Sequence, residues 1–191
     1  MCFVVFAVFV YFIGSINFAI VFFRLTGKED PRTGFSGNPG ATNVYRQAGL
    51  GAAAIVLFLD VARAAAVSAA AIYLFSPPGI AWAGLALLAG NRYPCFHQFK
   101  GGKGVGNYLG FCAMIVPAAA LLSCAAWAAG FLLLRKPFVG SFAMTAVLAG
   151  ASILKWRDFP LAMAGAAVAA LFIVFNHRTN VAGCFSKNTL K

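Results

Sequence analysis

The chain has 191 residues, of which 62% are hydrophobic and only 10% are charged. An ordinary soluble domain carries about 25% charged residues, so this composition excludes a soluble domain. It indicates a membrane protein with several spans, and we predict a single domain over residues 1–191. The net charge of +11 comes from basic residues in the short connections between apolar runs, a distribution typical of membrane topology signals and not of a nucleic-acid-binding face.

The first half of the chain alternates apolar runs with polar connections. Residues 2–23 lack the basic start and the cleavage site of a signal peptide, so we predict a retained span. Residues 24–50 form the longest polar stretch. Residues 51–75 and 80–96 are predicted to be the second and third spans, separated by an uncharged turn.

The uncharged segment 105–134 admits two topologies. One continuous helix of this length would measure about 45 Å, whereas roughly 30 Å crosses the hydrocarbon core. If the segment crosses once, Arg135 and Lys136 lie outside with the basic tail. If it breaks near Pro117 into two short helices, both come inside, which the positive-inside rule favours.

Two further apolar runs, 137–154 and 159–175, complete the predicted spans. The prediction is therefore an all-α integral membrane protein with about seven short transmembrane helices. Its N-terminus is expected outside and its C-terminus inside, so that the polar loops 24–50 and 97–104 both face the inside.

Residues 99–107 read Phe-Lys-Gly-Gly-Lys-Gly-Val-Gly-Asn. Glycine lets backbone N–H groups converge on an anion, and adjacent lysines add positive charge. The spacing is not that of a Walker A loop. Two interpretations remain open: a phosphate-binding loop, or a flexible basic turn whose glycines serve helix packing in the membrane.

A second polar segment, residues 35–43, reads Phe-Ser-Gly-Asn-Pro-Gly-Ala-Thr-Asn and precedes Arg46. It is rich in hydrogen-bond donors and has no carboxylate, which favours an anion ligand. A helix that begins near Ala41 would add the dipole of its N-terminus. The alternative is that the segment only caps that helix, and both can be true. We predict that the two segments are walls of one phosphate-binding site.

Charged and titratable residues at the spans are few. Asp60 and Arg63 share a helix face in the second apolar run, and we interpret them as a structural ion pair, with a role near the site as the alternative. His177 follows the last span and is either an acid, base or phosphate donor or an interfacial cap. Four acidic residues in the whole chain provide no cluster for magnesium, so neither a metal nor another cofactor is expected.

Five segments carry a family resemblance. They are Gly14-Ser15-Ile16, Asp30-Pro31-Arg32-Thr33, Ser36-Gly37-Asn38-Pro39-Gly40-Ala41-Thr42-Asn43-Val44, Phe99-Lys100-Gly101-Gly102-Lys103-Gly104-Val105 and His177-Arg178-Thr179-Asn180. In this order and spacing, over residues 11–182, they resemble the bacterial acyl-phosphate:glycerol-3-phosphate acyltransferases, the PlsY family. The chain departs from the family pattern at Asn91, where a histidine is usual, and at Gly140, where a serine is expected and Ser141 follows.

The resemblance implies a seven-helix enzyme of the bacterial inner membrane with its active site on the cytoplasmic side. It implies transfer of a fatty acyl group from acyl phosphate to the 1-hydroxyl of glycerol 3-phosphate, which gives lysophosphatidic acid and phosphate in the first acylation of phospholipid synthesis. The implied partners are these two small substrates, the lipid bilayer and an upstream enzyme that produces acyl phosphate.

The site residues that the resemblance implies form two groups. The catalytic group is Ser36, Asn38, Arg46, Lys103 and His177. The substrate-binding group is Gly37, Gly40, Thr42, Asn43, Asn91, Lys100, Gly101, Gly102, Gly104 and Asn180. We expect Lys103, Arg46 and the loop N–H groups to orient two anions and stabilise developing charge. Two alternatives stay open: a catalytically degenerate member that binds phosphorylated lipid precursors, and a small transporter of anions or phosphorylated metabolites.

Overall fold

The computed structural model describes residues 2–186, and its regular elements over that range are helices. The helices are α1 (Phe3–Gly14), α2 (Phe18–Leu25), α3 (Ala41–Leu74), α4 (Pro77–Arg92), a 3₁₀ turn (Cys95–His97), α5 (Val105–Ala113), α6 (Pro117–Leu134), α7 (Pro137–Lys155), α8 (Pro160–Asn176) and α9 (Arg178–Ser186). The predicted all-α class is therefore confirmed.

Proline sets several helix starts. Pro77, Pro117, Pro137 and Pro160 each occupy the first turn of a helix, where the missing N–H costs nothing and the fixed φ angle suits the helix. The predicted break near Pro117 is confirmed, because α5 ends at Ala113 and α6 begins at Pro117.

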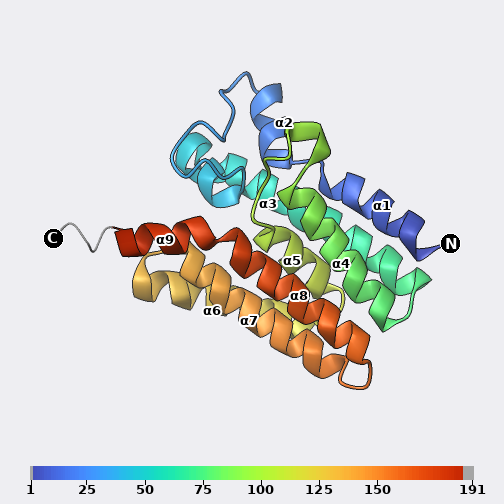
Figure 1. Ribbon diagram of the computed structural model, residues 1–191. Coiled ribbons are helices and arrows are strands. Elements are labelled where there is room, and N and C mark those ends of the chain that lie inside the picture. Colours follow the sequence, from blue (N-terminus) through green and yellow to red (C-terminus); the bar gives the residue numbers. More distant parts are fainter. Residues whose placement is uncertain (1, 187–191) are drawn as a thin grey trace.

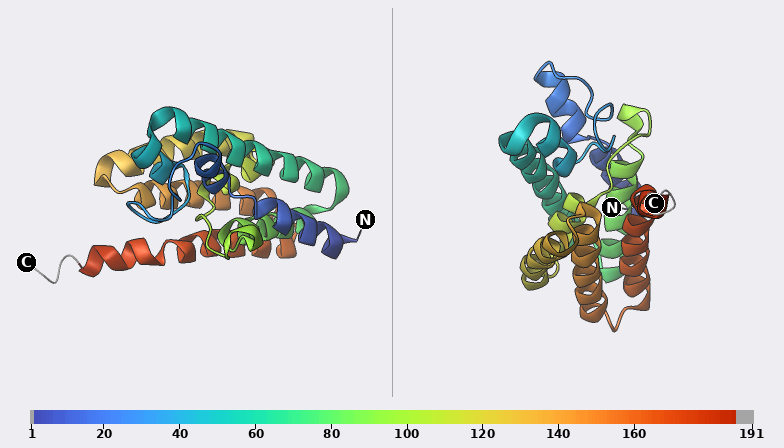
Figure 2. Two further views of the ribbon diagram at one scale, coloured as in Figure 1. Left: turned by 90° about the horizontal axis from the view of Figure 1, so that it is seen from above. Right: turned by 90° about the vertical axis from the view of Figure 1, so that its left-hand side faces the viewer.

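The helices form one elongated bundle (Figures 1 and 2). The most extensive pairings are α6 with α7, α3 with α5, α1 with α4, and α4 with α8. The start of α1 and the short α9 lie at opposite ends of the bundle in Figure 1 and in the left view of Figure 2. The polar loops between α2 and α3 and between α4 and α5 both lie on the side away from the start of α1.

Side chains are distributed as expected for a protein whose solvent is lipid. Large apolar residues such as Leu133 and Leu121 are about 80% exposed, whereas Asn17, Asn107 and Ser152 are buried. Polar groups inside the bundle can pair with each other or with backbone, which lipid cannot offer.

Among the described residues, four segments are long and apolar enough to cross a membrane, or five if the bent pair of α8 and α9 is one span. They are Phe3–Leu25 (which includes the break between α1 and α2), α3, α6 and α7. Helix α5 has nine residues, about 13 Å, which is too short to cross alone. The count of seven spans therefore stays a prediction, as does the orientation of the termini.

Candidate active site

A cavity of about 390 Å³ lies where the two polar segments meet the ends of α3, α5, α7 and α8. All five predicted catalytic residues line it: Ser36, Asn38, Arg46, Lys103 and His177. Seven of the predicted binding residues also line it: Gly40, Thr42, Asn43, Asn91, Gly102, Gly104 and Asn180. Residues more than 140 positions apart in the sequence thus meet in one cavity.

A buried amide, that of Asn43, helps to hold the loop before α3. Nδ2 of Asn43 donates to the carbonyl oxygens of Pro31 (2.8 Å) and Gly34 (3.2 Å), and its Oδ1 accepts from the N–H of Ser36 at 3.4 Å. Helix α3 begins at Ala41, as expected from the sequence. Its first N–H groups have no partner within the helix, and Gly40 to Thr42 line the cavity, so a positive helix terminus faces any anion bound there.

The glycines of the second loop act differently from the expectation. The N–H groups of Gly101 and Gly102 donate to the carbonyls of Arg92 (3.1 Å) and Asn91 (3.0 Å), so they do not point at a ligand. A Cβ on Gly101 would lie 2.0 Å from the Asn91 carbonyl oxygen. These two glycines therefore let the loop pack on the end of α4, and the predicted cradle of loop N–H groups is wrong at both positions.

Lys103 is the central cation of the cavity. Its Nζ donates to Oδ1 of Asn180, and its carbonyl accepts from Nδ2 of Asn176 at 3.4 Å. Both partners lie at the end of α8 and in α9, so the loop is tied to the C-terminal helices. Burial, with a smaller effect from the nearby Arg92 guanidinium, lowers the pKa of Lys103 to about 8.

His177 is buried at the end of α8. Its Nδ1 lies 2.8 Å from the carbonyl oxygen of Ile173, which can only accept, so Nδ1 carries the hydrogen. The ring packs edge-on against Phe142, with centroids 5.4 Å apart. This arrangement leaves Nε2 available to the cavity that His177 lines and fixes the tautomer.

Two polar residues of the cavity wall, Asn107 and Ser141, had no assigned role in the sequence analysis, and a third, Asp60, was given a role near the site only as the alternative. Asp60 pairs with Arg63 at 3.0 Å and also lines the cavity, so both interpretations of this pair hold. Asn107 is the last residue of the glycine-rich segment 99–107. Its place in that segment was the only feature of the sequence that pointed to a role for Asn107 in the site. Ser141 lies on the cavity wall, while Gly140 faces Trp127 in α6.

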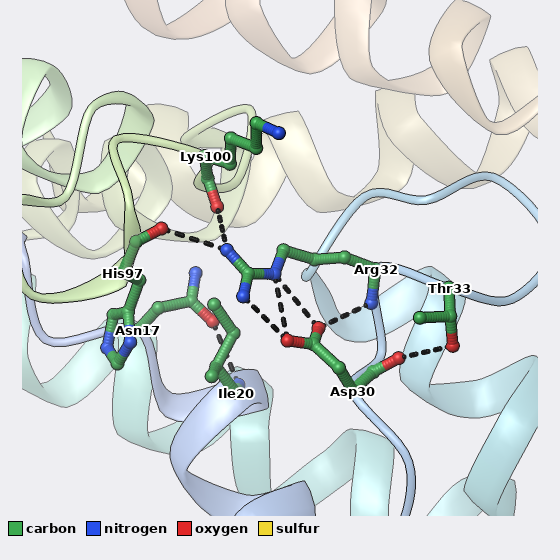
Figure 3. Close-up of polar contacts among 7 residues, drawn as sticks. All are labelled: Asn17, Ile20, Asp30, Arg32, Thr33, His97 and Lys100. Atoms are coloured by element: carbon green, nitrogen blue, oxygen red, sulfur yellow. Dashed lines mark hydrogen bonds and ion pairs between the residues drawn. The ribbon is translucent and has the colours of Figure 1, made fainter.

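Three predicted binding residues lie elsewhere. Gly37, Lys100 and Gly101 line a second cavity, next to the first, and not the cavity of Lys103. Arg32 joins the loop between α2 and α3 to the loop between α4 and α5. It bonds Asp30 in its own loop and donates to the carbonyls of His97 (2.8 Å) and Lys100 (3.4 Å) in the other, as Figure 3 shows. Within residues 2–186 no group of three or more His, Cys, Asp or Glu side chains is placed to hold a metal ion.

Comparisons with known proteins agree on one family. The sequence profile of the family described as Glycerol-3-phosphate acyltransferase matches residues 4–187. Proteins of that name from Pseudomonas fluorescens Pf-5 and Pseudomonas entomophila L48 are 39% and 36% identical over 181 residues, which are 94% of this chain and 94% of each relative.

Two solved structures have the same fold. They are crystal structures of PlsY (YgiH), an integral membrane glycerol 3-phosphate acyltransferase, in a glycerol 3-phosphate form and a lysophosphatidic acid form. Their TM-scores are 0.86 and 0.84 at 32% and 30% identity, and the matches cover 97% of this chain and 92% of those chains. The chain is therefore an integral membrane protein that belongs to the glycerol-3-phosphate acyltransferase family.

Proposed function

We propose that this protein transfers a fatty acyl group from acyl phosphate to the 1-hydroxyl of glycerol 3-phosphate. The observation that carries the proposal is the single cavity in which Lys103, Arg46, His177 and the start of α3 converge. Relatives at 36–39% identity bear the name glycerol-3-phosphate acyltransferase, and the similar structures were obtained in glycerol 3-phosphate and lysophosphatidic acid forms. These are a substrate and a product of the proposed reaction.

The cavity has the mixed lining that an acyl phosphate requires. Its polar side chains come mainly from the loops and helix ends around Ser36 and Lys103, whereas apolar side chains come from the helices. The large apolar members include Leu57, Leu109, Trp127, Phe138 and Met144. A volume near 390 Å³ is within the usual range of about 300–1,000 Å³ for small-molecule sites. Phosphate and acyl chain can therefore both find complementary surface.

The reaction needs positioning and charge stabilisation more than a protein nucleophile. The 1-hydroxyl oxygen attacks the acyl carbonyl carbon, the bond from that carbon to the phosphate oxygen breaks, and phosphate leaves. The hydroxyl proton passes to a phosphate oxygen, so atoms and charge balance without a covalent enzyme intermediate. Lys103, Arg46 and the start of α3 supply positive charge that offsets the repulsion between the two anions.

The charge distribution supports a cytoplasmic active site in the bacterial inner membrane. Among residues 2–186, most basic residues outside the helices, including Arg32, Lys100 and Arg135, lie in connections at the cavity end, whereas Lys155 at the end of α7 and Arg157 after it lie at the other end. Basic loops remain on the cytoplasmic side. On that side the protein would receive acyl phosphate from an upstream acyl-phosphate-producing enzyme.

The test is turnover by the purified protein in lipid or detergent. Palmitoyl phosphate and glycerol 3-phosphate are supplied, and lysophosphatidic acid and inorganic phosphate are measured together. We expect equal amounts of both products, dependent on both substrates, and loss of turnover in Lys103→Ala. Arg157→Gln is the matched control, since it removes one exposed charge at the other end of the bundle.

Two other outcomes would overturn the proposal. Binding of glycerol 3-phosphate without any product would favour a catalytically degenerate relative. Absence of both product and binding would favour transport of a phosphorylated metabolite, although the described part of the spans offers few charged groups beyond Asp60 and Arg63 for a polar path.

A further inference from the structure

A second cavity of about 460 Å³ adjoins the first and has a different set of polar groups. Neighbouring residues of the same loops separate the two: Gly101 lines the second cavity and Gly102 the first. Its charged lining groups are Asp30, Arg32, Arg92 and Lys100. The cavity therefore has a net positive lining that the acyl-transfer chemistry does not use.

Two of these four charges are already paired. Arg32 bonds Asp30 through Nε and Nη2, the shortest contact being 2.6 Å, and its Nη1 donates to the carbonyls of His97 and Lys100. The hydrogen bonds from Arg32 hold the pKa of the Asp30 carboxyl below its usual value. In Figure 3 this pair fills the space between the two loops, and the side chain of Lys100 extends away from it. The pair is structural and leaves no charge for a ligand.

Arg92 and Lys100 are the remaining cations. The Nε atom of Arg92 is buried and bonds no atom of residues 2–186, and its Nη1 makes a long contact of 3.4 Å with the carbonyl of Gly101. The guanidinium lies over the ring of Tyr93, with 5.6 Å to the centroid. Lys100 is exposed, and the Gln98 side chain lines the same space. A buried donor without a partner costs free energy unless a ligand supplies the acceptor.

We propose that this second cavity is an anion site that binds a phosphate monoester group through Arg92 and Lys100. Two uncompensated positive charges match the roughly −2 charge of a phosphate monoester near neutral pH, and the planar guanidinium suits its oxygen atoms. The phosphate can belong to a free molecule or to the headgroup of a lysophospholipid, because Phe99, 59% exposed, also lines the cavity. The site is distinct from the Lys103 cavity and does not depend on acyl transfer.

The number of bound phosphate esters tests the proposal. Full-length protein in detergent is dialysed against radiolabelled glycerol 3-phosphate, with inorganic phosphate and micellar lysophosphatidic acid as competitors. We expect the wild type to bind two equivalents, Arg92→Gln and Lys100→Gln to bind one, and Lys103→Ala to lose the other one. Arg157→Gln should keep two, and gel filtration checks that each variant is folded.

The competitors identify the source of the phosphate. Displacement of the second equivalent by inorganic phosphate assigns the site to free phosphates, and displacement by lysophosphatidic acid alone assigns it to a lipid headgroup. A single wild-type equivalent that is lost in Lys103→Ala and kept in Arg92→Gln and Lys100→Gln, or two equivalents in both of these last variants, would overturn the proposal. Because the readout is binding, a protein that fails the turnover assay but keeps a second, Arg92-dependent equivalent would refute the proposed function and not this site.

Discussion

Arg63 donates a hydrogen bond from Nη2 to Oδ1 of Asn107 at 2.6 Å, and Asn107 in turn donates to Oδ1 of Asn91 at 3.1 Å. The carbonyl of Asn91 accepts the N–H of Gly102. At its other side Arg63 bonds Asp60 and the carbonyl of Ile16 in the break between α1 and α2. A charged pair within α3 is thus connected through two amides to the loop that carries Lys103.

Removal of the middle amide should therefore affect both stability and catalysis. In Asn107→Ala the Arg63 guanidinium and the Asn91 amide each lose a buried partner, which costs about 1–3 kcal/mol. We expect a lower unfolding temperature in detergent and a lower kcat, because the Lys103 loop loses its support. Ser68→Ala is the matched control, since the Ser68 hydroxyl is buried on the same helix as Arg63 and bonds no described atom. Equal turnover in the two variants would show that the connection has no catalytic role.

The packing role of the loop glycines predicts an ordered series of alanine variants. A Cβ on Gly101 would meet a backbone oxygen at 2.0 Å, whereas one on Gly102 would meet its nearest atoms at 3.2 and 3.3 Å. The backbones of the two packed segments cannot move apart without a large cost in free energy. Gly101→Ala should therefore abolish turnover and destabilise the protein by about 1–3 kcal/mol or more. Gly102→Ala should be milder.

Gly51→Ala is the control for this series, because nothing lies within 4 Å of its added Cβ. Thermal unfolding and initial rates measured on the three variants give the ranking. A Gly101→Ala protein as active as Gly51→Ala would restore the interpretation of a phosphate-binding loop whose N–H groups point at the ligand.

The lowered pKa of Lys103 predicts a pH dependence of substrate binding. Burial disfavours the ammonium form, so the pKa falls from 10.5 to about 8. Below this pH the side chain is a cation that attracts phosphate, and above it the charge is lost. The KM for glycerol 3-phosphate should therefore rise by up to about tenfold between pH 7 and pH 9.

Lys103→Arg is the matched variant for that measurement. Arginine stays charged over the whole range, so its KM should change less with pH even if its kcat is lower, because the guanidinium has a different shape. Initial rates at constant ionic strength provide both profiles. Parallel KM profiles in the two proteins would assign the pH effect to another group.

Local signals predicted part of this structure well. The proline at 117 broke the long apolar segment, and the small polar residues before Ala41 preceded a helix start, because both effects act over a few residues. The family resemblance grouped the predicted catalytic residues, and they line one cavity. The destination of the Gly101 N–H could not be predicted in this way, since it depends on how closely the loop approaches α4.

Dependence on tertiary contacts also explains why the sequence did not predict which residues line the second cavity. Lys100 and Lys103 are three positions apart in one glycine-rich loop, and nothing in the local sequence distinguishes their roles. In the structure the carbonyl of Lys100 is held by Arg32, from another loop, while Lys103 bonds Asn180 near the chain end. Tertiary contacts between distant segments decide which lysine enters which cavity.

The serine of α7 gives the last prediction. The family pattern led us to expect a serine at 140, but Ser141 lines the cavity, and its Oγ donates to the carbonyl of Pro137 at 3.1 Å. Gly140 instead faces α6, where an added Cβ would lie 2.6 Å from the carbonyl oxygen of Trp127. The substitution Gly140→Ser should therefore push α6 away from α7. It should lower the stability of the protein by about 1–3 kcal/mol without a gain in turnover.

Ser141→Ala should do the opposite, because it removes a hydroxyl from the cavity and leaves the helix contact intact. We expect a kcat reduced by about tenfold or more with an unchanged unfolding temperature. Gly150→Ala, with nothing within 4 Å of the added Cβ in the same helix, controls for substitution in α7. Full turnover in Ser141→Ala would show that this hydroxyl has no catalytic role, and higher turnover in Gly140→Ser would show that a serine serves the site better at 140. The expected result would instead show that the hydroxyl acts from position 141, on the face of α7 that lines the cavity.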